Sequence, residues 1–128
     1  MIIHTHDYDS DYSPAMPFVE IQARRRAGQL PVTLKAIVDT GADATMIPLT
    51  TLRQLNARKG RTSWLSGAAG GRYEVDLYTI AVQIGDFRPL YVHVVGSERL
   101  GEVIIGRDVL NQFVVTLNAL ANTVEVAL

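Results

Sequence analysis

The fold is decided by residues 36–48, which read AIVDTGADATMIP from Ala36 to Pro48. Three apolar residues lead into Asp39-Thr40-Gly41, and a short polar turn then returns to an apolar pair. This pattern predicts a strand that ends at Asp39 in a tight turn, where Gly41 lets other groups approach the backbone closely. A carboxylate held between two apolar segments is rigid enough to be a reactive group, but Asp-x-Gly also occurs in ordinary turns. The remainder of the chain has to decide between these two interpretations.

Length, charge and cysteine content narrow the class of protein. A chain of 128 residues predicts one domain with a real core. Its net charge of −1 indicates no strongly positive surface that would attract nucleic acid, so we expect no nucleic-acid partner. The absence of cysteine excludes disulfides, thiolate chemistry and cysteine-based metal sites. No signal sequence and no run of about 18 apolar residues is present. We therefore expect a cytoplasmic protein, or a soluble domain of a longer or anchored protein, that makes no membrane contact itself.

Residues 1–16 are polar and acidic, and they predict an N-terminal segment that is loose or pairs with a sheet edge. The segment carries metal-ligand residue types: Asp7, Asp9 and Asp11 alternate, and His4 and His6 come just before them. Their spacing fits no metal motif, so we expect no metal site.

The pattern of residues 17–128 is mainly that of β-strands. Alternating apolar residues predict a hairpin from 17–22 and 31–38, and another from 114–117 and 123–128. Leucines at helical spacing predict one short helix over 48–56, and residues 107–113 suggest a second. Seven or more short strands with one or two helices fit a closed or folded-over barrel better than a βαβ fold.

Six consecutive small residues, Ser66 to Gly71, lie between two β-prone arms at 61–65 and 72–76. This run is longer than a two-residue hairpin turn requires, so it predicts a flap over a site rather than an ordinary turn. Along 73–84 the apolar positions change parity, which predicts a bulge or a change in the buried face.

Three features therefore occur in order: the Asp39-Thr40-Gly41-Ala42-Asp43 motif, the glycine-rich flap, and Val103-Ile104-Ile105-Gly106-Arg107-Asp108-Val109-Leu110. Together they resemble the retroviral-type (retropepsin-like) aspartic proteases, including cellular and bacterial members, over residues 17–128. The resemblance implies an all-β fold: a retropepsin-like closed β-barrel with a glycine-rich flap hairpin and one or two short helices.

The resemblance also implies roles for individual residues. Asp39 corresponds to the catalytic aspartate, and the Thr40 hydroxyl to the group that locks this loop to the same loop of a partner chain. The Gly41 carbonyl is expected to face substrate, and Asp43 is expected to pair with Arg107 and brace the loop. The implied substrate-binding residues are Gly41, Ala42, Asp43, Ala44, Ser66, Gly67, Ala68, Ala69, Gly70 and Gly71.

One chain carries one Asp-Thr-Gly, whereas aspartic proteases need two carboxylates. We therefore expect a homodimer with the site on its two-fold axis, and an interface formed largely by the hairpin of residues 114–128. Two adjacent carboxylates share one proton and activate a water molecule, so no metal or cofactor is needed. The expected substrate is an extended peptide or protein segment. Because Ala42 offers no hydroxyl to stabilise the carboxylate, we expect a pH optimum in mild acid.

Two alternatives remain open. The fold could serve as a non-catalytic peptide-binding or dimerisation module, although such a module would not need Asp39-Thr40-Gly41. A non-proteolytic hydrolase with Asp39 as nucleophile would need a metal or phosphate site. The sequence contains no glycine-rich phosphate loop and no histidine–aspartate cluster of suitable spacing.

Overall fold

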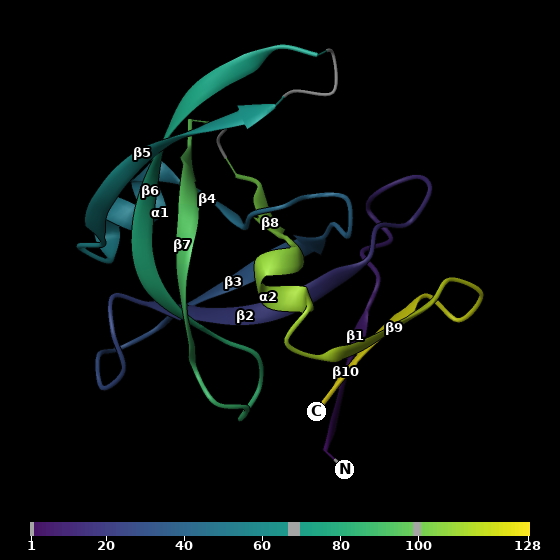
Figure 1. Cartoon of the computed structure of the whole chain (residues 1–128). Helices are drawn as coiled ribbons and strands as arrows, with labels where there is room; N and C mark the ends of the chain where they lie inside the picture. Colours follow the sequence, from purple (N-terminus) through teal and green to yellow (C-terminus); the bar gives the residue numbers. More distant parts are fainter. Residues whose placement is uncertain (1, 67–69, 99–100) are drawn as a thin grey trace.

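The structure, a computed structural model, describes residues 2–66, 70–98 and 101–128 (Figure 1). Its strands and helices follow one another along the chain with short connections. They are β1 (Ile3–Asp7), β2 (Phe18–Arg24), β3 (Val32–Val38), β4 (Met46–Pro48), α1 (Leu49–Gln54), β5 (Arg58–Ser66), β6 (Arg72–Gln83), β7 (Leu90–Ser97), β8 (Val103–Ile105), α2 (Arg107–Leu110), β9 (Val114–Asn118) and β10 (Thr123–Ala127).

The main sheet has seven strands in the order β2-β3-β8-β4-β7-β6-β5. Strand β2 also pairs with β6, so six of these strands form a closed ring of pairings and β5 is left outside it. The predicted mainly β architecture with short helices is confirmed. Within the described ranges, no helix is long and apolar enough to cross a membrane.

The β2–β3 hairpin positions Asp39, which directly follows β3. The alternation of buried and exposed side chains sets the register of the hairpin. The strands pair antiparallel from Phe18 opposite Ile37 to Ala23 opposite Val32. On one face of the hairpin, Val19, Ile21, Ala23 and Ala36 are fully buried. Burial of each large apolar side chain contributes about 1.5–3 kcal/mol. A shift by one residue would expose this whole face, so the buried face fixes where β3 ends.

Helix α1 is shorter than the predicted range of 48–56. Leu52 and Leu55 are buried, as the helical spacing indicates. The helix ends early because Asn56 adopts a left-handed conformation, with φ 53°, and the next residue, Ala57, donates its N–H to the Leu52 carbonyl at 2.9 Å.

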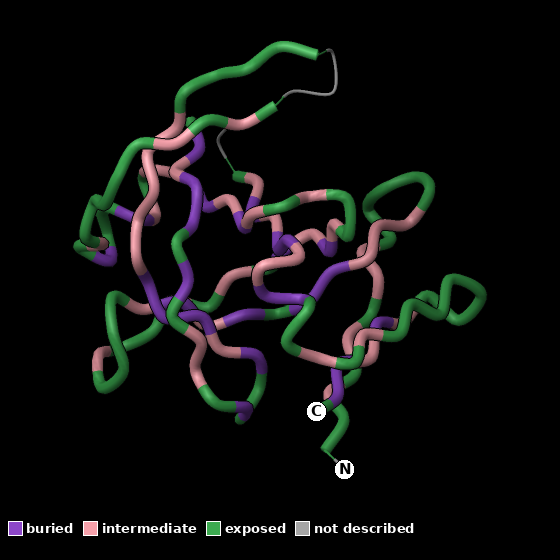
Figure 2. The backbone as a smooth tube through the Cα atoms, in the orientation of Figure 1, coloured by how far each residue is buried: buried purple, intermediate pink, exposed green. Residues whose placement is uncertain are grey.

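The parity change along 73–84 does not interrupt β6, which is continuous from Arg72 to Gln83. The irregularity lies in its partner β5, between Lys59 and Thr62, where the register shifts. Strand β6 is exposed at Arg72 and fully buried at Ile80 (Figure 2). The same strand therefore belongs to the predicted flap hairpin at one end and to the core at the other.

A second sheet joins both ends of the chain, in the order β1-β10-β9. The two termini accordingly lie near each other in Figure 1. His4 of β1 contacts the body of the protein through Asp86, at 2.6 Å, and meets the Phe87 ring edge-on at a centroid distance of 4.9 Å. Asp9 instead binds Lys35 at 2.7 Å. His4 and Asp9, two of the metal-ligand residue types of the N-terminal segment, are thus engaged in separate contacts.

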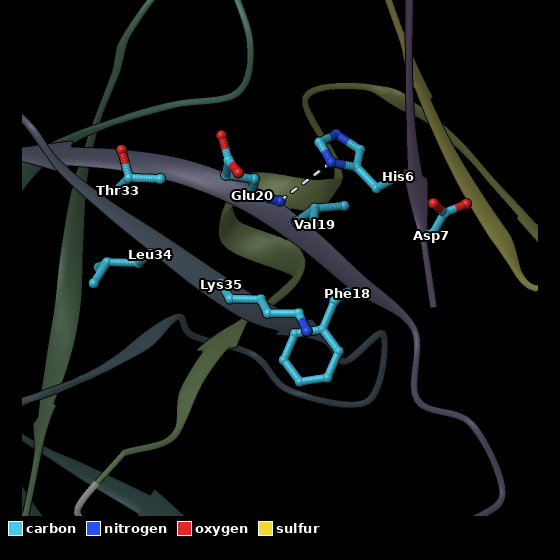
Figure 3. A pocket seen from close by; sticks show the side chains of 8 residues that line it. All are labelled: His6, Asp7, Phe18, Val19, Glu20, Thr33, Leu34 and Lys35. Carbon is cyan, nitrogen blue, oxygen red and sulfur yellow. Dashed lines mark hydrogen bonds between the residues drawn. The ribbon is translucent and has the colours of Figure 1, made fainter. Parts of the chain in front are cut away.

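His6 attaches β1 to β2 beside a hollow of about 310 Å³ that lies between β1 and the β2–β3 hairpin (Figure 3). Its Nδ1 accepts a hydrogen bond from the Glu20 backbone N–H at 3.2 Å. That bond requires an unprotonated Nδ1. Burial lowers the pKa of His6 from 6.5, and the nearby carboxylates of Glu20 and Asp7 oppose this shift only in part.

We expect His6 to make stability depend on pH. The unfolded chain takes up a proton near pH 6.5, whereas the folded chain does so only at lower pH. The contribution of neutral His6 to the free energy of unfolding is therefore complete above pH 6.5. It is lost as pH falls through the lower pKa that His6 has in the folded chain. Thermal unfolding of wild type and His6→Gln between pH 7.5 and 4.5 measures this, with His93→Gln, at an exposed position of β7, as control. The expected result is a flatter curve for His6→Gln, and an unchanged slope would contradict it.

Candidate active site

Asp39 follows directly on β3, at the point where β3 runs parallel to β8. Val38 lies opposite Ile105, and the Asp39 backbone N–H donates to the Ile105 carbonyl at 3.1 Å. The Asp39 side-chain Oδ1 accepts the Gly41 N–H at 2.9 Å. The carboxylate is half-buried, so it is fixed in direction and still accessible. A Cβ at Gly41 would lie 3.3 Å from this same oxygen, a tight approach that explains a glycine here.

Arg107, the first residue of α2, holds the loop that follows Asp39. Its backbone N–H donates to the Ala42 carbonyl at 2.9 Å, and its Nη1 donates to the Thr40 carbonyl at 2.7 Å. Its Nη2 forms an ion pair with the Asp43 carboxylate. The side chain of Asp43 is 80% exposed, so the pair adds little stability. Its effect is on the geometry of the loop, which is tied to α2 at three positions.

A buried network behind the loop involves two residues that the sequence analysis does not single out, Thr45 and Asp108. Thr45 is fully buried. Its hydroxyl donates to Asp108 Oδ1 at 2.7 Å and accepts the Gly106 N–H at 3.1 Å. Its backbone N–H donates to Asp108 Oδ2 at 2.9 Å. Two weak signals could have indicated the pair: Asp108 follows Arg107 directly, and Thr45 is a hydroxyl residue that leads into a buried strand.

Gly106 allows α2 to pack this closely against the loop. A Cβ there would lie 2.8 Å from the Ala44 carbonyl group and 2.9 Å from the Ala42 carbonyl oxygen. Both contacts are with backbone, which cannot move aside easily. Any residue could adopt the Gly106 φ of −101°. The position therefore needs glycine because there is no space for a side chain, and not because of its backbone conformation.

The predicted flap is the hairpin of β5 and β6, which projects from the body of the sheet (Figure 1). Ser66 lies opposite Arg72, and Gly70 has a φ of 87°. The predicted substrate-binding residues Gly67, Ala68 and Ala69 lie outside the described residues. The structure thus brings together residues 39–45 with Arg107, while the described flap residues belong to a separate hairpin.

A half-buried carboxylate, fixed on a rigid turn and left accessible, is suited to acid–base chemistry on a bound substrate. Residues 13–118 match the family model described as retroviral aspartyl protease. The chain belongs to this family of aspartic proteases. No curated protein matches it significantly.

Solved structures of the same fold come from a virus, a bacterium and a eukaryote. A retropepsin-like aspartic protease from Rickettsia conorii matches with a TM-score of 0.65 and 16% identity, over 98% of this chain and 91% of that one. The EIAV protease, complexed with the inhibitor HBY-793, matches with a TM-score of 0.57 and 19% identity, over 76% and 86%. The retroviral protease-like domain of Ddi1 from Leishmania major matches with a TM-score of 0.55 and 18% identity, over 88% and 92%. At these identities the likeness establishes the fold: a retropepsin-like one.

Proposed function

We propose that this chain is an aspartic endopeptidase that acts as a homodimer, with one Asp39 from each copy in the site. The observation that carries the proposal is the position of Asp39. It is fixed by the Gly41 N–H and the Ile105 carbonyl, on a loop that Arg107 holds at three positions.

The chemistry follows from two carboxylates brought together. At a separation of about 3 Å both cannot ionise, so the pair holds one proton. The ionised member takes a proton from a water molecule, which attacks the peptide carbonyl carbon. The protonated member donates a hydrogen bond to the carbonyl oxygen as it becomes tetrahedral, and the proton on the pair then passes to the leaving amine. This sequence forms no covalent enzyme intermediate.

Two features support assembly of two copies. The Thr40 side chain is exposed, and its hydroxyl makes no hydrogen bond within the part of the chain that the structure describes, so it is free to bond a second copy. The hairpin of β9 and β10 exposes large apolar side chains, with Val114 at 62% and Leu117 at 44%. Apolar exposure of this kind is typical of a surface that another chain covers.

The experiment is digestion of casein and of a peptide library by the purified chain, followed by dilution. A homodimeric endopeptidase cuts within the peptides, and its rate per chain falls when dilution separates the copies. A non-catalytic binding module on the same fold leaves all peptides intact at every concentration, and that result would overturn the proposal.

Replacing Arg107 by Lys is expected to lower kcat/KM about ten-fold while leaving the melting temperature nearly unchanged. Lysine keeps the charge, but one ammonium cannot reproduce the two-pronged contact with the Thr40 carbonyl and Asp43. Peptide-cleavage kinetics and thermal unfolding measure the two effects. Arg88→Lys, on the exposed turn after β6, is the matched control. An unchanged kcat/KM would show that the contact does not position the loop.

A further inference from the structure

The hollow between β1 and the β2–β3 hairpin lies outside the candidate active site. Figure 3 shows the residues that line its volume of about 310 Å³, and neither the loop 39–45 nor Arg107 is among them. Its apolar lining comes from Phe18, Val19 and Leu34. The hollow therefore offers an apolar wall to a long side chain that enters it from another molecule.

Two carboxylates that line the hollow have no cationic partner. Asp7 ends β1 and Glu20 lies on β2, and within the described ranges neither of them forms an ion pair. The Lys35 ammonium also lines the hollow, but it is paired with Asp9 at 2.7 Å. Burial lowers the pKa of His6 from 6.5, so this neighbouring ring is uncharged at neutral pH. The charges of the two carboxylates are therefore available to a cation.

The part of the chain that contributes these carboxylates is acidic as a whole. Residues 1–23 contain four acidic side chains and neither lysine nor arginine, a local charge of −4 in a chain of net charge −1. Such a region attracts cations and repels anions before any contact is made. Charge and apolar lining together therefore favour a ligand that has a cationic head on an aliphatic stem.

We propose that this hollow binds an arginine side chain of a partner protein. The aliphatic stem packs against the apolar lining, and the guanidinium bonds to the carboxylates of Asp7 and Glu20. A guanidinium carries five N–H donors in one plane, so it serves two carboxylates from different elements better than a lysine ammonium does. The proposed homodimer interface, the hairpin of β9 and β10, contributes no residue to the lining, so we assign the arginine to a different protein.

The test is an NMR titration of the full chain carrying Asp39→Asn, which keeps peptides intact whether or not the chain is a protease. The probes are capped peptides of five residues with one arginine between glycines. A second peptide has citrulline, which has the same shape without the charge, and a third has an arginine analogue whose stem is two methylenes shorter. We expect the arginine peptide to bind at least about ten-fold more tightly than either of the others. Equal binding of the citrulline or the short-stem peptide would overturn the proposal.

The same titration locates the binding site. The backbone amide resonances of Glu20, Thr33 and Lys35, which line the hollow, are expected to shift as the arginine peptide is added. Shifts confined to the loop 39–45 would place the peptide in the candidate active site and overturn the proposal.

Two variants complete the test. Glu20→Gln, at an exposed position of β2, is expected to weaken binding of the arginine peptide about ten-fold. Asp11→Asn removes the same charge from the acidic N-terminal segment but does not line the hollow, so it is expected to change the affinity less than about two-fold. Equal losses in the two variants would mean unspecific attraction and overturn the proposal. Sedimentation of Glu20→Gln is expected to match the parent chain, and a weaker dimer would instead assign the hollow to an arginine of a second copy.

Discussion

Replacing Asp39 by Asn is expected to lower kcat/KM for peptide cleavage at least about a thousand-fold while the chain remains folded and dimeric. Asparagine has nearly the same shape as aspartate and still offers an oxygen to the Gly41 N–H, which Asp39 Oδ1 accepts at 2.9 Å. It cannot take a proton from water, so the water is not activated. Cleavage of a fluorogenic peptide measures the loss, and circular dichroism and sedimentation verify the fold and the dimer.

The matched control is Asp11→Asn, the same change at an exposed aspartate of the N-terminal segment, which is expected to alter kcat/KM less than about two-fold. Both variants remove one carboxylate from each chain, so a difference in kcat/KM between them comes from the position of the carboxylate and not from the change in net charge. Undiminished cleavage by a clean Asp39→Asn preparation would refute the enzyme assignment. Loss of the dimer in that variant would instead give Asp39 a structural role in assembly.

Replacing Thr45 by Val is expected to destabilise the protein by about 2–4 kcal/mol. Valine fills the same space, so the loss comes from hydrogen bonds alone. The Asp108 carboxylate loses the hydroxyl that donates to it at 2.7 Å, and the buried Gly106 N–H loses its acceptor. Urea unfolding measures the effect. We also expect kcat/KM to fall, because this network ties the loop after Asp39 to α2.

Thr33→Val controls for the change of residue type. Thr33 is exposed on β3, where valine is favoured, so we expect a change within about 0.5 kcal/mol. Asp108→Ala tests the other half of the network and should destabilise the protein by an amount similar to Thr45→Val. Their combination should then cost less than the sum, since both remove the hydrogen bond from the Thr45 hydroxyl to Asp108. Equal stability of Thr45→Val and Thr33→Val would show that the network adds nothing.

Local patterns predict the parts of this fold in which neighbouring residues determine the structure. Side-chain alternation predicts the β2–β3 hairpin, and the apolar run before Asp39 predicts that this residue ends a strand. The leucine spacing indicates the buried face of α1 but not its end. That end depends on the left-handed conformation of Asn56, which a period of apolar residues does not encode.

Contacts between distant segments are harder to predict. Arg107 and Asp43 are 64 residues apart, and only resemblance to a known family suggests that they pair. The structure contains this ion pair, while its role in catalysis stays a prediction. Thr45 and Asp108 are separated by 63 residues, and neither a motif nor the resemblance pairs them. A threonine and an aspartate are common residues in turns, so their types and positions give only weak signs of a shared buried network.

The sequence by itself determined a mainly β chain with an Asp-Thr-Gly turn at the end of a strand, and it predicts that Asp39 is reactive and that the run of small residues is a flap. It could do so because alternation, glycine runs and the Asp-Thr-Gly turn are local, and local backbone preferences act without the rest of the fold. The tertiary structure decided how rigidly that carboxylate is held. Strand β8 lies beside β3 only once the sheet has formed, and that pairing brings Arg107 and Asp108 to the loop and leaves Gly106 against its carbonyl groups.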